Sequence, residues 1–280
     1  YFLLSVTIIF FSMLGYGLFL NNNFIKNDLF FTLTAGYFFI GTLTLIIHFV
    51  SPINDVISNL ILFIGLSIFF VKSKQVDLKE IIKKTSVMLV ICLLLILYTS
   101  NPIDSNMYHH PYVSYLNNEK IIFGVAEIQF RFGHISFLQY VQAISSNRFI
   151  HELALAAPNL ILYSFFLFYC VDIIFRENKN SILYLVTLLI ICFILIKFSR
   201  YNEFGNDILP FLLSSYIFMN IINQIFKPSE DRIKIILLAP LFAIFIFTHK
   251  ISYLFVCLIF LSILEKKDLI RFLKNKFIIL

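Results

Sequence analysis

The sequence predicts an all-α, polytopic membrane protein, and both its composition and the length of its apolar runs support this class. Hydrophobic residues fill 60% of the 280 positions, charged residues fill only 14%, and the mean hydropathy is +0.90. Soluble globular proteins carry about 25% charged residues. Only helices and closed barrels satisfy all their backbone hydrogen bonds inside a bilayer. We therefore expect one helical membrane domain over residues 1–280.

About nine apolar segments have a length near the ~20 residues that a helix needs to cross a bilayer. Their ranges are 2–20, 29–50, 53–71, 86–100, 153–175, 182–198, 208–226, 233–248 and 251–264. The fourth segment is short, and we expect its helix to begin nearer Ile81. The chain starts at Tyr1 and ends in a new apolar run, so we expect it to be part of a longer protein.

The loops between these segments alternate in charge, which predicts their orientation. Basic loops follow the third, fifth, seventh and ninth segments, and carry Lys72, Lys74, Lys79, Lys83, Lys84, Arg176, Lys179, Lys227, Arg232, Lys266, Lys267, Arg271, Lys274 and Lys276. The positive-inside rule assigns these loops to the cytoplasm. The remaining loops then share the outer face. These cations account for the net charge of +6 without a nucleic-acid partner.

The longest segment that apolar residues do not dominate is residues 101–150, called the insert below. Its titratable residues include Asp104, His109, His110, Glu119, Glu127, Arg131 and His134. Tyrosines recur at helical spacing in its first half, and residues 134–145 alternate between apolar and polar side chains at a helical period. Both patterns are typical of helices that lie in the membrane interface. We expect an extracytoplasmic loop with two interfacial helices.

Neither the cysteines nor the adjacent histidines have the spacing of a simple metal site. The cysteines are Cys92, Cys170, Cys192 and Cys257, and all lie in apolar runs at no metal-ligand spacing. His109 and His110 are neighbours, so on a helix their side chains point about 100° apart. A zinc site built on one helix face needs ligands at i and i+4.

Several short motifs lie on the predicted outer face. They are Asp104 followed by Tyr108-His109, then Gly124-Val125-Ala126, Arg131-Phe132-Gly133 with Ser136, Ser199-Arg200-Tyr201 through Asn206-Asp207, and Lys250-Ile251-Ser252. This series resembles a pattern in bacterial multispan proteins of the GT-C glycosyltransferase superfamily. The chain departs from the pattern in the turns of the insert. Phe123 replaces a proline, and His134-Ile135 replaces an asparagine.

The resemblance implies an enzyme of the bacterial cytoplasmic membrane that takes a sugar from a polyprenyl-phosphate donor on the extracytoplasmic face. Asp104 would be the catalytic carboxylate, acting as a general base or as a ligand to a divalent cation such as Mg²⁺ or Mn²⁺. Basic side chains would neutralise the phosphate leaving group. The expected substrate-binding residues are Tyr108, His109, Arg131, Arg200, Asp207 and Lys250.

Other membrane functions share parts of this pattern. A transporter of lipid-linked sugars would have a similar number of spans, but it should show repeated halves and polar or broken helices at mid-membrane. A polysaccharide polymerase or ligase would also act on a lipid-linked sugar at the outer face. We would expect it to have two sizeable arginine-bearing outer loops, whereas the loop at 199–207 is short. A structural membrane subunit would need none of the motifs.

Overall fold

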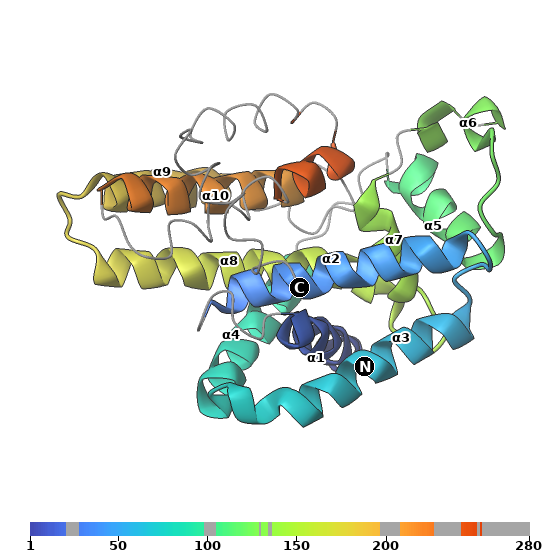
Figure 1. Cartoon of the computed structure of the whole chain (residues 1–280), viewed down its shortest axis with the longest axis horizontal. Helices are drawn as coiled ribbons and strands as arrows, with labels where there is room; N and C mark the ends of the chain where they lie inside the picture. The colour runs from blue at the N-terminus through green and yellow to red at the C-terminus, as the bar shows by residue number, and fades with distance from the viewer. Residues whose placement is uncertain are drawn as a thin grey trace, which may run out of the picture.

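The computed structural model describes residues 1–20, 28–97, 105–128, 130–133, 136–196, 208–226, 242–250 and 253, and its regular structure there is entirely helical. This confirms the all-α class (Figure 1). The longer helices are α1 (Phe2–Leu20), α2 (Leu29–His48), α3 (Asp55–Lys72), α4 (Leu78–Leu97), α8 (Ala157–Arg176), α9 (Ile182–Ile196) and α10 (Ile208–Phe226). The shorter ones are η1 (Ser73–Gln75), η2 (Ser105–His109), α5 (His110–Asn118), α6 (Val125–Ile128), η3 (Phe130–Gly133), α7 (Phe137–Ile144) and η4 (Glu152–Ala156). Residues 242–249 are also helical.

Five of these helices are long and apolar enough to cross a membrane, which indicates an integral membrane protein. They are α1, α2, α3 with the turn after it, η4 with α8, and α10. The predicted count of about nine is not confirmed. In the part of the chain that the structure describes, α9 has only 15 residues and α4 carries charges in its first two turns. The ninth predicted segment lies outside the described residues except for residue 253.

The helices alternate in direction, which gives the bundle two ends of different chemistry. At one end the Nε atom of Arg148 lies 3.2 Å from the Oδ2 atom of Asp55, at the start of α3. Tyr1 also reaches this end, where its hydroxyl donates to the carbonyl of Arg148 at 3.5 Å. At the other end the Nζ atom of Lys84 lies 3.4 Å from the Oδ2 atom of Asp172. We call these the insert end and the basic end.

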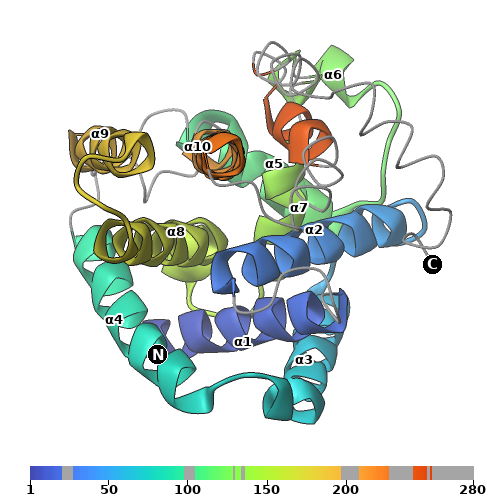
Figure 2. The same cartoon turned by 60° about the vertical axis from the view of Figure 1, so that its left-hand side comes forward.

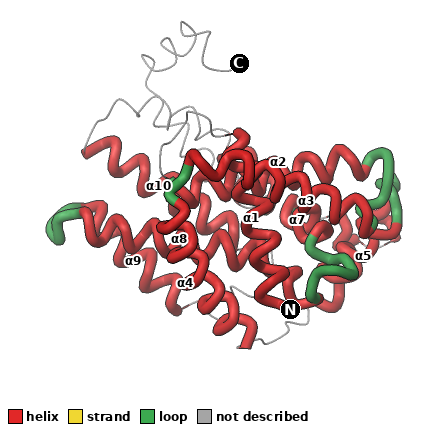
Figure 3. Tube along the Cα trace, turned by 90° about the horizontal axis from the view of Figure 1, so that it is seen from below, coloured by secondary structure: helices red, strands yellow, loops and turns green. Residues whose placement is uncertain are grey.

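The figures show the same separation. The turn between α8 and α9 lies at one extreme of the molecule, and α5 and α7 lie toward the other (Figures 1 and 3). Arg176 and Lys179 belong to the first extreme, which is the basic end. The alternation of loop charge therefore predicted correctly that the two basic loops that the structure describes, after α3 and after α8, share an end of the bundle.

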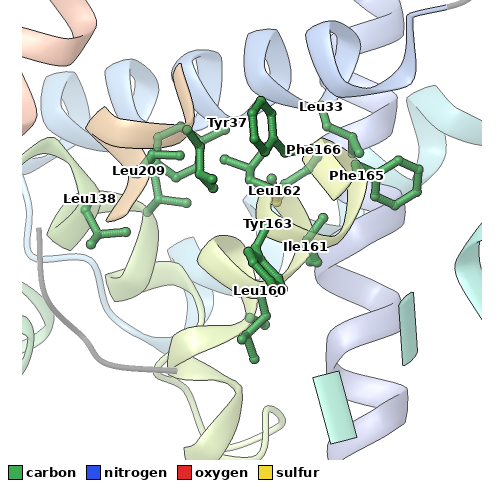
Figure 4. Packing of buried hydrophobic residues seen from close by; sticks show 14 of the residues in the cluster. Leu33, Tyr37, Leu138, Leu160, Ile161, Leu162, Tyr163, Phe165, Phe166 and Leu209 are labelled. Atoms are coloured by element: carbon green, nitrogen blue, oxygen red, sulfur yellow. The ribbon is translucent and has the colours of Figure 1, made fainter. Parts of the chain in front are cut away.

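Helix α8 is the central element of the described bundle. Leu160, Ile161, Leu162 and Tyr163 are consecutive in sequence and all fully buried, so the first half of α8 contacts protein on every side. Its neighbours are α1, α2, α4, α9 and α10. Figure 4 shows these four side chains of α8 in the buried cluster that also contains Tyr37 of α2.

The outer surfaces of α3, α4 and α9 are apolar. Phe63 of α3, Val90 of α4 and Leu189 of α9 leave 67%, 57% and 70% of their surface exposed. A helix that faced water would carry polar side chains at such positions. These surfaces therefore fit contact with lipid.

A close crossing of α1 with α2 and α3 completes the core (Figure 2). Gly15 of α1 faces the backbone carbonyl of Gly65 in α3, and Gly36 of α2 faces that of Met13 in α1. A methyl group on either Gly15 or Gly36 would collide with the facing oxygen. Small residues are enriched at such crossings in membrane proteins because they let two backbones approach closely.

The two ends predict a labelling experiment on the exposed residues Gln75, in η1 at the basic end, and Asn118, in α5 at the insert end. In intact cells a membrane-impermeant thiol reagent should modify Asn118→Cys and leave Gln75→Cys unmodified, because basic loops stay in the cytoplasm. The unsubstituted chain gives the background from the exposed Cys192. Labelling of Gln75→Cys without Asn118→Cys would reverse the orientation.

Candidate functional site

The insert packs into the bundle through α7. This helix spans Phe137–Ile144, within the range 134–145 predicted to be an interfacial helix. Every residue from Leu138 to Ile144 is buried, with α2, α3 and α5 as the main neighbours. An interfacial helix keeps one face open to the headgroups. The structure therefore corrects the expected position: α7 is a core helix, and its polar side chains face protein.

A capping box at the start of α7 fixes the orientation of Gln139. The Oγ atom of Ser136 accepts a hydrogen bond from the backbone N–H of Leu138 at 3.3 Å. In return, the Oε1 atom of Gln139 accepts from the backbone N–H of Ser136 at 3.1 Å. Because Oε1 is the acceptor, the Nε2 atom of the same amide is the donor that remains.

This donor sets the tautomer of His109, one of the predicted substrate-binding residues. The Nε2 atom of Gln139 lies 3.2 Å from the Nδ1 atom of His109. Since the amide N–H donates, Nδ1 accepts, and the proton of a neutral His109 sits on its Nε2 atom. His109 is only 4% exposed, and its ring centroid lies 4.2 Å from that of Tyr108. The predicted Tyr108-His109 pair is thus held together, with a defined donor on the histidine.

A second hydrogen-bond chain joins α5 and α7 to the end of α2. The Tyr112 hydroxyl donates to that of Tyr140, which donates to the Nδ1 atom of His48 at 3.5 Å. The Nε2 atom of His48 donates to the carbonyl of Glu119 at 2.9 Å. Burial raises the pKa of both tyrosines, so both hydroxyls stay neutral donors. The chain holds the first part of the insert against the bundle.

Four polar side chains at the insert end have buried polar atoms without a hydrogen-bond partner, counted over the residues that the structure describes. The atoms are Oδ1 of Asn117, Oε1 and Nε2 of Gln142, Oγ of Ser145, and Oδ1 and Nδ2 of Asn159. Most buried polar atoms in proteins are paired. An unpaired one costs about 1–3 kcal/mol. These groups were absent from the residues predicted from the sequence.

The sequence does hold a signal for two of these four residues, Gln142 and Ser145. Gln139, Gln142 and Ser145 recur at every third position in the run FLQYVQAIS, which places them on one face of an otherwise apolar helix. An amphipathic helix at the membrane surface produces the same pattern. Only the packing of α7 distinguishes a buried polar stripe from one that faces headgroups.

The structure describes only some of the predicted site residues. Asp104, Arg200 and Asp207 lie outside the described residues. Arg131 is described for its backbone alone, in η3, where the next residue, Phe132, packs with its ring centroid 5.2 Å from that of Tyr112. The predicted convergence of all these residues therefore stays a prediction.

Lys250 is joined to the same region through its neighbour His249. The His249 ring centroid lies 5.8 Å from that of Phe137, the first residue of α7. The Nδ1 atom of His249 donates to the carbonyl of Phe245 at 2.7 Å, and its Nε2 atom accepts from the hydroxyl of Tyr37 at 2.9 Å. The first turn of α7 therefore has His109 beside Gln139 and the segment of Lys250 beside Phe137.

A divalent cation remains an expectation attached to Asp104. Over the described ranges, no three His, Cys, Asp or Glu side chains are grouped in a way that could hold a metal ion. The polar groups placed around α7 are amides, hydroxyls and imidazoles. Such groups bind hydroxyl or phosphate oxygens by hydrogen bonds.

The role of Gln139 predicts a stability difference between two variants. Gln139→Leu removes the capping acceptor and the donor to His109, and should lower the free energy of unfolding by about 1–3 kcal/mol. Gln139→Glu keeps the capping acceptor and offers a carboxylate to a protonated His109. The loss of free energy of unfolding in Gln139→Glu should become smaller as the pH falls from about 7 to about 5. A carboxylate partner raises the folded pKa of a histidine, so the stabilisation is present at low pH and is lost as the pH rises.

Thermal unfolding of the purified proteins across this pH range measures both effects. Equal and pH-independent losses for Gln139→Leu and Gln139→Glu would contradict the contact between Gln139 and His109.

Comparison with known proteins identifies a family. The family model described as "Domain of unknown function (DUF8201)" matches residues 1–280, the whole chain. No curated protein and no solved structure matches the chain.

Proposed function

The chain belongs to the DUF8201 family, and for it we propose a membrane glycosyltransferase that works at the insert end. Its donor is a sugar linked to polyprenyl phosphate, and its acceptor is a hydroxyl on the extracytoplasmic face of a bacterial cytoplasmic membrane. The motif resemblance to GT-C enzymes supports the reaction class, and the polar groups gathered around α7 support its place in the fold.

The observation that carries the proposal is the arrangement of the Tyr108-His109 pair against the first turn of α7. His109 is buried, and Gln139 fixes its proton on the Nε2 atom. The pair lies at the end of the bundle where α2 ends and α3 begins. A lipid-linked sugar carries its phosphate and sugar at the membrane surface, which is the depth of such helix ends. Histidine and tyrosine are residue types that recognise headgroup oxygens by hydrogen bonds, so their position at this depth supports the proposal.

The proposed step is a displacement at the anomeric carbon of the donor. The acceptor oxygen forms a bond to this carbon, and its proton passes to the carboxylate of Asp104. The bond between the carbon and the phosphate oxygen breaks, and its electron pair leaves with polyprenyl phosphate. Arg131, Arg200 and Lys250 stabilise the charge that grows on this phosphate. In a second form of the proposal, Asp104 holds Mg²⁺ or Mn²⁺.

The distribution of charge favours surface chemistry over transport. In the five candidate spans the structure describes, charged side chains occur only near the helix ends. A pathway for a polar substrate through the membrane usually carries ionisable or polar groups at mid-membrane. A polymerase or ligase would use the same donor chemistry and differ only in its acceptor.

Two arginines of the insert test the assignment of the donor site. Arg131→Ala should raise the KM for the polyprenyl-phosphate sugar more than it lowers kcat, because the lost cation binds the phosphate in both substrate and transition state. Arg148→Ala is the matched control, because Arg148 is 89% exposed and pairs with Asp55 at the surface. Such a pair contributes about 0–1 kcal/mol to stability.

Transfer assays on membranes at several donor concentrations separate KM from kcat for both variants. An unchanged KM for Arg131→Ala, or an equal rise for Arg148→Ala, would remove Arg131 from the phosphate site.

A further inference from the structure

We propose that Asn117, Gln142 and Ser145 form a binding site for the uncharged hydroxyl groups of a sugar. The inference deepens the proposed function and rests on it for the identity of the ligand. It adds residues that the motif resemblance does not include, and it assigns them to the sugar ring and not to the phosphate.

The contacts of α5 with α7 bring these three residues to the same end of α7. Gln142 and Ser145 are three residues apart at the end of α7, so they share a helix face. The Nδ2 atom of Asn117 donates to the carbonyl of Ser146 at 2.8 Å, which places the Asn117 side chain against the backbone that directly follows Ser145. Asn159 lies in the first turn of α8. This helix continues directly from η4, and η4 packs on α7.

The bonding state of these atoms points to a ligand. Within the described part of the chain, the Asn117 Oδ1 atom, both polar atoms of Gln142 and the Ser145 Oγ atom lack partners. Gln142 and Ser145 are fully buried. By contrast, Gln139, one turn earlier on the same face, has both its amide atoms paired. The unpaired state is therefore local to the last turn of α7.

The chemistry of these groups matches sugar hydroxyls. Each amide offers both donors and an acceptor, and a serine hydroxyl offers one donor and two acceptor sites. A sugar hydroxyl also donates and accepts, so one ring can pair with all three side chains. None of the three carries a charge that would favour phosphate.

The test compares wild type with two variants that replace a buried polar side chain by an apolar one of similar size. Gln142→Met alters the proposed site. Thr85→Val alters a buried hydroxyl of α4, a helix that starts at the basic end, whose Oγ1 atom also lacks a partner among the described residues. The full chain is purified in detergent, and its Tm is measured against increasing glucose, galactose, mannose and N-acetylglucosamine, with inorganic phosphate in a separate series.

We expect at least one of the four sugars to raise the Tm of wild type and Thr85→Val in a saturable way. Gln142→Met should show only a non-saturable rise in Tm, because sugars are excluded from the surface of any protein and stabilise it without binding. Phosphate should give no saturable rise that depends on Gln142. If Gln142→Met does not fold, Ser145→Ala takes its place, with a loss of the saturable rise expected. A wild-type chain without a saturable rise, or an equal rise in the site variant, would overturn the site.

These outcomes separate the site from the proposed function. A saturable rise in a chain that transfers no sugar would leave the binding site standing and remove the transferase. If the chain transfers sugar but no sugar shifts its Tm, the transferase stands and the binding site is removed.

Discussion

Asp104→Asn should accumulate in the membrane at the wild-type level and lose most of its sugar-transfer activity. Asparagine keeps the shape of the side chain but cannot accept the proton of the acceptor hydroxyl, and it binds divalent cations weakly. The loss of a general base typically lowers the rate by roughly 10²–10⁴-fold. A change away from the core typically alters stability by less than about 0.5 kcal/mol. The measurement is initial-rate transfer per unit of membrane protein.

The matched control for Asp104→Asn is Glu119→Gln. Glu119 belongs to the same insert and its side chain is exposed, while the contact it makes with His48 uses the backbone carbonyl. The control should keep wild-type activity and wild-type amount. Normal transfer by Asp104→Asn would end its assignment as the catalytic acid, and Asp207 and Glu127 would be the next carboxylates to test.

Gly15→Val should cause the largest loss of stability among the changes considered. Its side chain would enter the space of the Gly65 carbonyl, and the backbone of α3 cannot rotate away as a flexible side chain could. Overpacking of a well-packed core costs about 1–3 kcal/mol and sometimes more. We expect the upper part of this range, because the facing atom belongs to a helix backbone.

Leu4→Val is the control on the same helix, since Leu4 is 58% exposed and its replacement creates no collision. Thermal unfolding of both purified variants compares them directly. A Tm for Gly15→Val equal to that of Leu4→Val would show that α1 and α3 are not tightly apposed at this point.

The sequence predicted the long helices well where polar residues or the start of the sequence bound an apolar run. The predicted segments 2–20 and 208–226 coincide with α1 and α10. The start of α4 was harder to predict from the sequence. Its first turn is charged, and the Oδ1 atom of Asp77 caps it by accepting from the backbone N–H groups of Lys79 and Glu80 at 2.9 and 3.3 Å. Hydropathy does not register such a cap. The predicted segment therefore began at residue 86, and even the expected helix start near Ile81 lies after the observed start at Leu78.

The candidate site was harder to predict, because its parts depend on tertiary contacts. The Tyr108-His109 pair stood out in the sequence as a motif. Its partner Gln139 did not, because the link runs through a capping box in a helix that begins 28 residues after His109. The buried state of Gln142 depends on how α7 packs against α2, α3 and α5. The period of polar residues along α7 carries no information about which surface covers them.

The central claim is that the insert end transfers sugar from a polyprenyl-phosphate donor, and a reconstituted transfer assay tests it most directly. The purified full chain is placed in liposomes, supplied with polyprenyl phosphate bearing a radiolabelled sugar and with membrane extract as the source of acceptor. We expect label to leave the lipid for an acceptor-linked product with wild type, and Asp104→Asn to lose most of this transfer. If native membranes transfer label to the same extract but the wild-type chain leaves the label on the lipid, the proposed transferase function is wrong.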